Sequence, residues 1–198
     1  MTRKRATSVQ QLVDAAAIVF ERKGFAEATI SDIAAEAGVS KPTVYQYVTS
    51  KRWLLETIVE QVIYPLRHSI DEIVDSDLPA REKLTRYLRV QVDAAIRYRT
   101  YYAVLNAGQH QLSPQALRNY TSWAREVNHI ATGLFKLCAD EGVVRADLDV
   151  ATTVNLINGM MLSIARWYDD KGKLDPEQLL DHTLRLLSGY ILPPQQDT

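Results

Sequence analysis

Residues Ile30–Val48 read ISDIAAEAGVSKPTVYQYV, two short apolar-periodic segments on either side of Gly38. Ala34 precedes the glycine by one helical turn and Val44 follows it, a spacing that predicts two short helices joined by a tight turn. Glycine suits the positive φ of such a turn, and Ser40 is placed to cap the second helix. The stretch therefore predicts a helix-turn-helix, although the spacing alone also fits an ordinary helical hairpin.

The side chains that remain on the second helix of this pair favour the first interpretation. An ordinary solvated face is rich in Glu and Lys, but the segment from Ala37 to Leu55 contains no acidic residue. It offers hydroxyls, an amide and cations, the groups that contact phosphates and base edges in DNA. If Val44 points inward, the outward set that we expect to bind DNA is Lys41, Pro42, Thr43, Tyr45, Gln46 and Tyr47, with Lys51 just beyond the helix.

Two further groups extend this predicted DNA-binding surface. Thr29 and Ser31 stand at the start of the preceding helix, whose free amides can hold a phosphate. The N-terminus begins with the basic residues Arg3, Lys4 and Arg5, which can form a mobile arm along the DNA backbone or in a minor groove. A basic N-terminal triplet can equally be a disordered leader.

The block Phe20–Leu55, FERKGFAEATISDIAAEAGVSKPTVYQYVTSKRWLL, resembles the TetR family of one-component transcriptional repressors. It departs from the family pattern at Tyr47 and Val48, where many members have His and Phe, and at Trp53, where an acid is usual. These departures bear on which operator is recognised. The resemblance implies that Lys41, Pro42, Thr43 and Tyr45 face the major groove while Thr29, Tyr47 and Lys51 hold phosphates.

The rest of the chain reads as helical. Gly and Pro are sparse, at 8 and 7 of 198 residues, and strand-like alternation is hard to find. We expect an all-α fold of about nine helices, with an N-terminal helix-turn-helix domain at 1–52 and a ligand-binding and dimerisation domain at 53–198. Beyond the first 75 residues the expected helices are Ala80–Arg97, Thr100–Gln111, Pro114–Glu141, Asp149–Trp167 and Pro176–Ile191.

Composition narrows the function classes. The net charge is −1, yet residues 1–52 hold eight Lys or Arg against five Asp or Glu. The expected helix-turn-helix domain, called the head below, is therefore positive and the remainder of the chain negative.

A single cysteine, Cys138, excludes an intramolecular disulfide, and the longest apolar run, Val154–Ala165, is shorter than the roughly 20 residues of a membrane span. We expect a cytoplasmic protein without membrane association. The sequence lacks HExxH and GxSxG motifs and metal-ligand spacing, so no enzyme, cofactor or metal is predicted.

The segment Val154–Tyr168, VNLINGMMLSIARWY, is apolar almost all round and must be covered on two sides. With Gln178–Leu192 it can form half of a four-helix bundle across a two-fold axis, as the resemblance also implies. A homodimer suits operator reading, because two heads about 34–36 Å apart reach successive major grooves. Burial within the monomer is the alternative. The residues predicted to form the dimer interface are Met161, Ile164, Leu180, Leu184, Leu187 and Ile191.

Polar residues among apolar faces of the second domain suggest an effector pocket, because buried amides and arginines need partners. They can also satisfy one another or lie in the dimer interface. The segment Asp140–Leu179 looks similar to regulators of fatty-acid and sterol breakdown that respond to acyl-CoA thioesters. The predicted pocket residues are Tyr102, Asn106, His110, Trp123, Val127, Asn158, Leu162 and Arg166.

Together these features predict a repressor that binds a pseudo-palindromic DNA operator as a dimer. A small apolar or amphipathic effector, for which an acyl-CoA thioester is a candidate, would release it by favouring dimer states whose head spacing no longer fits. The alternative is a helical adaptor that binds a partner protein and has no operator.

Overall fold

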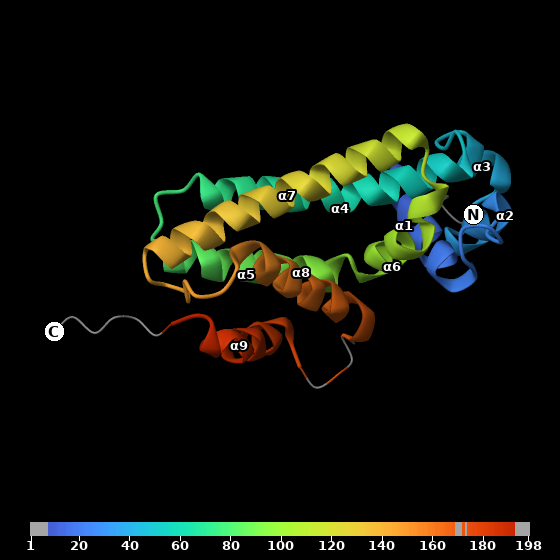
Figure 1. Ribbon diagram of the computed structural model, residues 1–198. Coiled ribbons are helices and arrows are strands. Elements are labelled where there is room, and N and C mark those ends of the chain that lie inside the picture. The colour runs from blue at the N-terminus through green and yellow to red at the C-terminus, as the bar shows by residue number, and fades with distance from the viewer. Residues whose placement is uncertain (1–7, 169–171, 173, 193–198) are drawn as a thin grey trace. The chain divides into compact units, whose positions relative to one another are not determined.

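The computed structural model describes residues 8–168, 172 and 174–192 (Figure 1). Within them the chain forms nine α-helices and no β-strand, which confirms the predicted all-α fold. The helices are α1 (Val9–Lys23), α2 (Ile30–Glu36), α3 (Lys41–Tyr45), α4 (Lys51–Val74), α5 (Ala80–Arg97), α6 (Arg99–Gly108), α7 (Pro114–Asp140), α8 (Val150–Trp167) and α9 (Pro176–Leu186).

The helices assemble into two compact units. The first runs to Ile63 and includes Thr100–Thr121, and the second comprises Tyr64–Arg99 and the residues from Ser122 onward. Helices α4 and α7 each run from one unit into the other, so the units differ from the sequence domains 1–52 and 53–198.

The first unit is built on α1. Ser8 caps this helix by accepting a hydrogen bond from the amide of Gln11 (3.1 Å), and Gly24, with φ of +79°, ends it. Helix α1 packs on α2, and α2 packs on α3. The core of this unit is formed by side chains that are at most 3% exposed: Leu12, Ala16, Phe20, Ile33, Val44, Leu54, Leu55 and Ile58.

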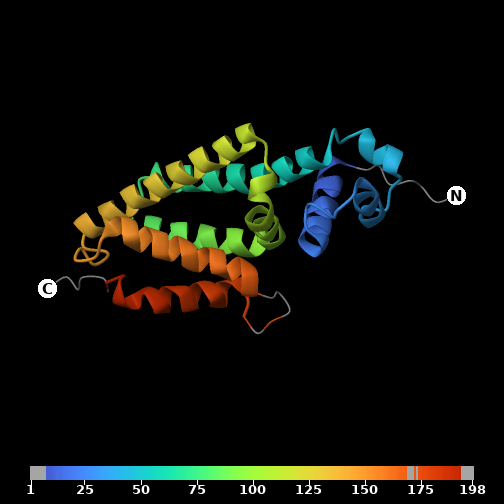
Figure 2. The same ribbon diagram turned by 45° about the vertical axis from the view of Figure 1, so that its right-hand side comes forward.

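In the second unit α5 packs against both α8 and α9, which Figures 1 and 2 show next to each other. Tyr87 on α5 and Phe135 on α7 meet edge to face, with ring centroids 5.9 Å apart. Tyr190 stacks on the Phe135 ring at 6.1 Å. This buried aromatic cluster joins α5, α7 and the segment that follows α9.

The end of the described chain is less helical than predicted. Helix α9 ends at Leu186, and a 3-10 turn follows at Leu187–Gly189. The reason is that the next backbone groups bond elsewhere: Arg145 donates its amide to Tyr190 O (3.0 Å) and Leu192 donates to Val143 O (2.9 Å). The expectation of a helix up to Ile191 was therefore wrong.

Candidate nucleic-acid interface

The turn between α2 and α3 has the geometry that the sequence predicts. Gly38 adopts φ of +69°, and its amide donates to Ala35 O (3.2 Å) while the next amide, of Val39, donates to Ala34 O (2.9 Å). Ser40 caps α3 by accepting from the amide of Thr43 (3.3 Å). The two short helices thus form a helix-turn-helix with Val44 fully buried beneath it.

Helix α3 presents the predicted side chains to solvent. Lys41, Pro42, Gln46 and the two tyrosines that follow Val44 are exposed, while Val44 and Val48 are buried. Tyr45 is 55% and Tyr47 41% exposed, unusual for large aromatic side chains. Thr43 is half-buried, and its hydroxyl lies 2.7 Å from that of Ser40, so it has a local partner.

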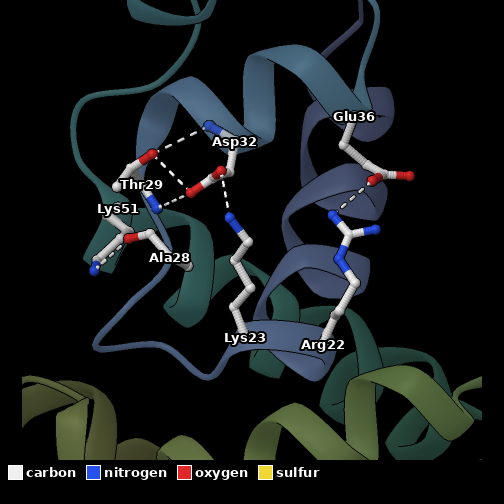
Figure 3. Close-up of polar contacts among 7 residues, drawn as sticks. All are labelled: Arg22, Lys23, Ala28, Thr29, Asp32, Glu36 and Lys51. Atoms are coloured by element: carbon white, nitrogen blue, oxygen red, sulfur yellow. Dashed lines mark hydrogen bonds and ion pairs between the residues drawn. The ribbon is translucent and has the colours of Figure 1, made fainter.

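The start of α2 is held by a capping box (Figure 3). The Thr29 hydroxyl accepts from the amide of Asp32 (3.1 Å) and donates to the Asp32 carboxylate (2.8 Å), which also accepts from the amide of Thr29 (3.0 Å). The hydrogen bond from Lys23 to this carboxylate (2.6 Å), together with those from Thr29, lowers the pKa of Asp32 to about 2. Asp32 therefore stays charged, and the predicted phosphate contact of Thr29 would have to form beside a carboxylate. Ser31 is exposed next to it.

A second ion pair joins α1 to α2. Arg22 lies 3.1 Å from Glu36 at the other end of α2, as Figure 3 also shows. Both pairs are largely solvent-exposed, so they orient α2 more than they stabilise it. Two of the cations counted in the positive head are thereby balanced by acids of α2.

Lys51 has different partners from the predicted phosphate. Its ammonium donates to the carbonyl oxygens of Phe25 (2.6 Å), Ala26 (3.1 Å) and Ala28 (2.8 Å) in the loop between α1 and α2. The same ammonium lies 4.5 Å from the centroid of the Phe25 ring. The arm predicted at Arg3, Lys4 and Arg5 lies outside the described residues.

Helix α6 contributes contacts to the first unit that the sequence did not reveal. The Tyr101 hydroxyl donates to the Asp14 carboxylate of α1 and accepts from the side-chain amide of Gln10 (3.3 Å). Gln61 of α4 donates to the Gln10 side chain (2.6 Å). These residues are distant in sequence and have the polar character of ordinary surface residues. The sequence therefore did not indicate that their side chains bond to one another.

The eight predicted pocket residues do not fall in one unit. Tyr102, Asn106 and His110 belong to the first, where the tyrosine is buried and the other two are exposed. The remaining five belong to the second, where Val127 is buried, Trp123 and Asn158 are half-buried, and Leu162 and Arg166 are exposed.

The second unit brings Asn158 into a chain of uncharged polar groups. Buried Gln91 donates to the Tyr87 hydroxyl (2.8 Å), which donates to Asn158 (3.2 Å). Asn158 donates to Asn128 (3.3 Å), which donates to exposed Asn155 (3.3 Å). Burial raises the pKa of Tyr87 to about 12, so its hydroxyl remains a donor. Gln91 and Asn128 were not among the predicted residues; an amide on the apolar face of α5 hinted at Gln91, and no local signal pointed to Asn128 on α7.

The predicted dimer-interface residues divide by burial. Met161, Ile164 and Leu180 are at most 4% exposed, so their side chains belong to the core of the single chain. Leu184, Leu187 and Ile191 are half-buried. The large apolar side chains exposed on the same helices are instead Leu156 (71%), Leu162 (44%), Trp167 (56%) and Leu186 (72%).

Comparisons with known proteins identify the family. Residues 12–58 match the family described as bacterial regulatory proteins, tetR family. Residues 77–191, more than half of the chain, match the tetracyclin repressor-like C-terminal domain. The chain belongs to the TetR family of transcriptional regulators. The resemblance read from Phe20–Leu55 is confirmed, and α2 and α3 are the helix-turn-helix of a DNA-binding TetR regulator.

Individual TetR regulators are similar over nearly the whole chain. The HTH-type transcriptional repressor KstR2 of Mycolicibacterium smegmatis is 24% identical over 188 residues, which cover 94% of this chain and 92% of that protein. The structure of the ketosteroid transcriptional regulator KstR2 of Mycobacterium tuberculosis has a TM-score of 0.86 at 21% identity, covering 98% of this chain and 100% of that one. AibR, crystallised with isovaleryl coenzyme A and operator DNA, has a TM-score of 0.77 at 18% identity, covering 92% and 98%.

These relatives are regulators of transcription, a class that acts by binding and not by catalysis. Among the described residues, no cluster of three or more His, Cys, Asp or Glu side chains is arranged to hold a metal ion. In the same part of the chain, no helix combines the length and the apolar character that crossing a bilayer requires.

Proposed function

We propose that this TetR regulator is a repressor that binds a pseudo-palindromic operator as a dimer and leaves it when a small apolar or amphipathic effector binds. The observation that carries the proposal is the surface of α3, where Lys41, Gln46 and the flanking tyrosines are exposed over a buried Val44. Polar and cationic groups on a short, well-anchored helix suit base edges and phosphates.

The chemistry of each side chain decides whether we assign it to the base edges or to the DNA backbone. Base edges are read by Lys41, Pro42, Thr43, Tyr45 and Gln46, because amides and ammonium groups pair with purine edges and methyl groups with thymine. Backbone contacts come from Tyr47, from Thr29 and Ser31 at the start of α2, and from the arm at Arg3, Lys4 and Arg5. Helix α3 has only five residues, so one copy makes few contacts, and two copies are needed for a specific site.

Exposed apolar side chains support the dimer. Leu156 and Trp167 lie eleven residues apart on α8, close to three helical turns, so they share one face. Leu186 is exposed on the neighbouring α9. Large apolar groups on adjacent helices are typical of an interface that a second copy covers.

Two observations favour an acyl-CoA thioester as the effector. AibR was crystallised with isovaleryl coenzyme A, and this chain shares its fold. The second unit of this chain also holds the uncharged polar chain from Gln91 to Asn155, which offers amide groups next to apolar side chains. An acyl chain with a polar, amide-bearing carrier combines the two chemistries.

A mobility-shift titration against the DNA upstream of its own gene tests the function. We expect specific binding whose affinity falls steeply with salt, with a slope of log K against log salt of about −0.9 per neutralised phosphate. A shuffled sequence of equal composition is the control. Equal affinity for both DNAs would exclude specific binding to an operator in this region and favour the adaptor alternative.

Gln46→Ala tests the reading role of α3. Because Gln46 is exposed at the end of α3, its loss should leave folding intact and weaken discrimination at one base pair by about 1–3 kcal/mol. Competition with operators mutated one position at a time measures this. Gln109→Ala, which removes an exposed amide from the turn after α6 and outside α3, is the matched control. If the base preferences of the Gln46 variant match those of the wild type, Gln46 does not read bases.

Effector binding is tested by thermal unfolding with acyl-CoA thioesters of increasing chain length. Since a ligand at 100 times its Kd stabilises the native state by about 2.7 kcal/mol, at least one thioester should raise Tm and release the operator. Free coenzyme A and the free acids are the controls. Asn158→Leu, which interrupts the polar chain, should weaken the response. If no thioester raises Tm and none releases the operator, this effector class is excluded.

A further inference from the structure

Lys51 is the first residue of α4, yet its ammonium is directed backward at the loop that precedes α2. Three carbonyl oxygens, of Phe25, Ala26 and Ala28, accept from it at 2.6, 3.1 and 2.8 Å. A lysine ammonium has three N–H donors, so all of them are used within the protein. The Phe25 ring, 4.5 Å away, adds a cation–π contact.

The arrangement suits lysine in particular. The converging carbonyls surround a compact ammonium whose three donors rotate freely, whereas an arginine carries a flat fork that matches a carboxylate or a phosphate. Figure 3 shows the Lys51 ammonium beside Ala28, directly before the capping box of Thr29 and Asp32. The ammonium therefore fixes the backbone just ahead of the first turn of α2.

This contact connects both ends of the reading helix. At one end α3 follows α2 through the Gly38 turn, and at the other end it leads into α4, whose first turn Ser50 caps by accepting from the amide of Trp53 (3.0 Å). Lys51 ties that first turn of α4 to the loop in front of α2. A helix of five residues has little packing of its own, so its orientation depends on these attachments.

We propose that Lys51 is a positioning residue, which orients α2 and α3 for DNA by clamping the loop at 25–28 and does not itself neutralise a DNA phosphate. The inference rests on the proposed operator binding. It contrasts with the phosphate contact that the family resemblance implies, and the two roles make opposite predictions for a substitution that keeps the charge.

Lys51→Arg and Lys51→Met separate the roles. A phosphate contact survives in the arginine variant and disappears in the methionine variant, where the salt slope drops by about one. A clamp fails in both variants, because neither side chain can satisfy three converging carbonyls. We expect both to lose at least about tenfold in operator affinity, as hydrogen bonds to a charged group disappear, with the salt slope unchanged. Lys41→Met, which also removes a cation, but an exposed one on the proposed base-reading surface of α3, is the matched control and should relax the base preference.

Hydrogen exchange measured by mass spectrometry on the DNA-free, full-length variants supplies a second readout. Amides in peptides covering residues 24–32 should exchange faster in both Lys51 variants and at the wild-type rate in the Lys41→Met control. Wild-type operator affinity in Lys51→Arg, a reduced salt slope in Lys51→Met, or unchanged exchange at 24–32 would each overturn the clamp. If the wild-type protein bound no operator, the proposed function would fail, and the exchange data would still decide whether Lys51 holds the loop.

Discussion

Replacing Leu156 by glutamate is expected to convert the protein to a monomer and to weaken operator binding by roughly 10²–10⁴-fold. Leu156 is 71% exposed on the outer face of α8, so the substitution costs little in the isolated chain. In a dimer that covers this face, each copy would bury an unpaired carboxylate, which is strongly unfavourable. Each monomer would then bind a half-site alone and lose the gain from two linked heads.

Light scattering on a sizing column measures the first effect, and a mobility-shift titration measures the second. Leu137→Glu is the matched control, because Leu137 is 39% exposed on α7 and outside the proposed interface. That control should remain dimeric with wild-type affinity. A Leu156→Glu protein that stayed dimeric would move the interface away from this face of α8.

The helix-turn-helix could be predicted because its signals are local. The positive φ at Gly38, the cap at Ser40 and the inward Val44 each follow from one residue and its immediate neighbours. The exposed face of α3 follows from the rotation of the helix about its axis: once Val44 points inward, Tyr45 and Gln46 must point outward.

Helix α8 shows where periodicity fails. It is apolar almost all round, so the pattern alone cannot separate the side facing its own core from the side facing a partner. The structure assigns Met161 and Ile164 to the core and leaves Leu156 and Trp167 exposed. Met161 and Ile164 are thus core residues of the single chain, and the proposed interface on α8 rests on Leu156 and Trp167.

Contacts between residues distant in the sequence could not be predicted either. Lys51 reads as a cation next to a DNA-binding helix, and nothing local shows that three carbonyls more than twenty residues earlier enclose it. The chain from Gln91 through Tyr87 to Asn158 likewise joins helices separated by some seventy residues. Such contacts depend on how the helices pack, which propensity and periodicity do not encode.

Phe135→Ala is expected to lower the free energy of unfolding by about 3–5 kcal/mol. Phe135 is 1% exposed and contacts the rings of both Tyr87 and Tyr190, so its removal leaves a cavity and ends two ring contacts. The loss is a large share of the roughly 5–15 kcal/mol that stabilises a typical domain. Because Tyr190 loses the ring on which it stacks, the segment after α9 should loosen as well.

Urea denaturation followed by circular dichroism measures the loss, and hydrogen exchange in residues 187–192 measures the loosening. Lys136→Ala, at the exposed neighbouring position of α7, is the control and should stay within about 0.5 kcal/mol of the wild type. Helices α1–α3 lie in the other compact unit, so operator affinity per folded dimer should persist at low temperature. An unchanged urea midpoint would show that the aromatic cluster does not hold α5, α7 and the C-terminal segment together.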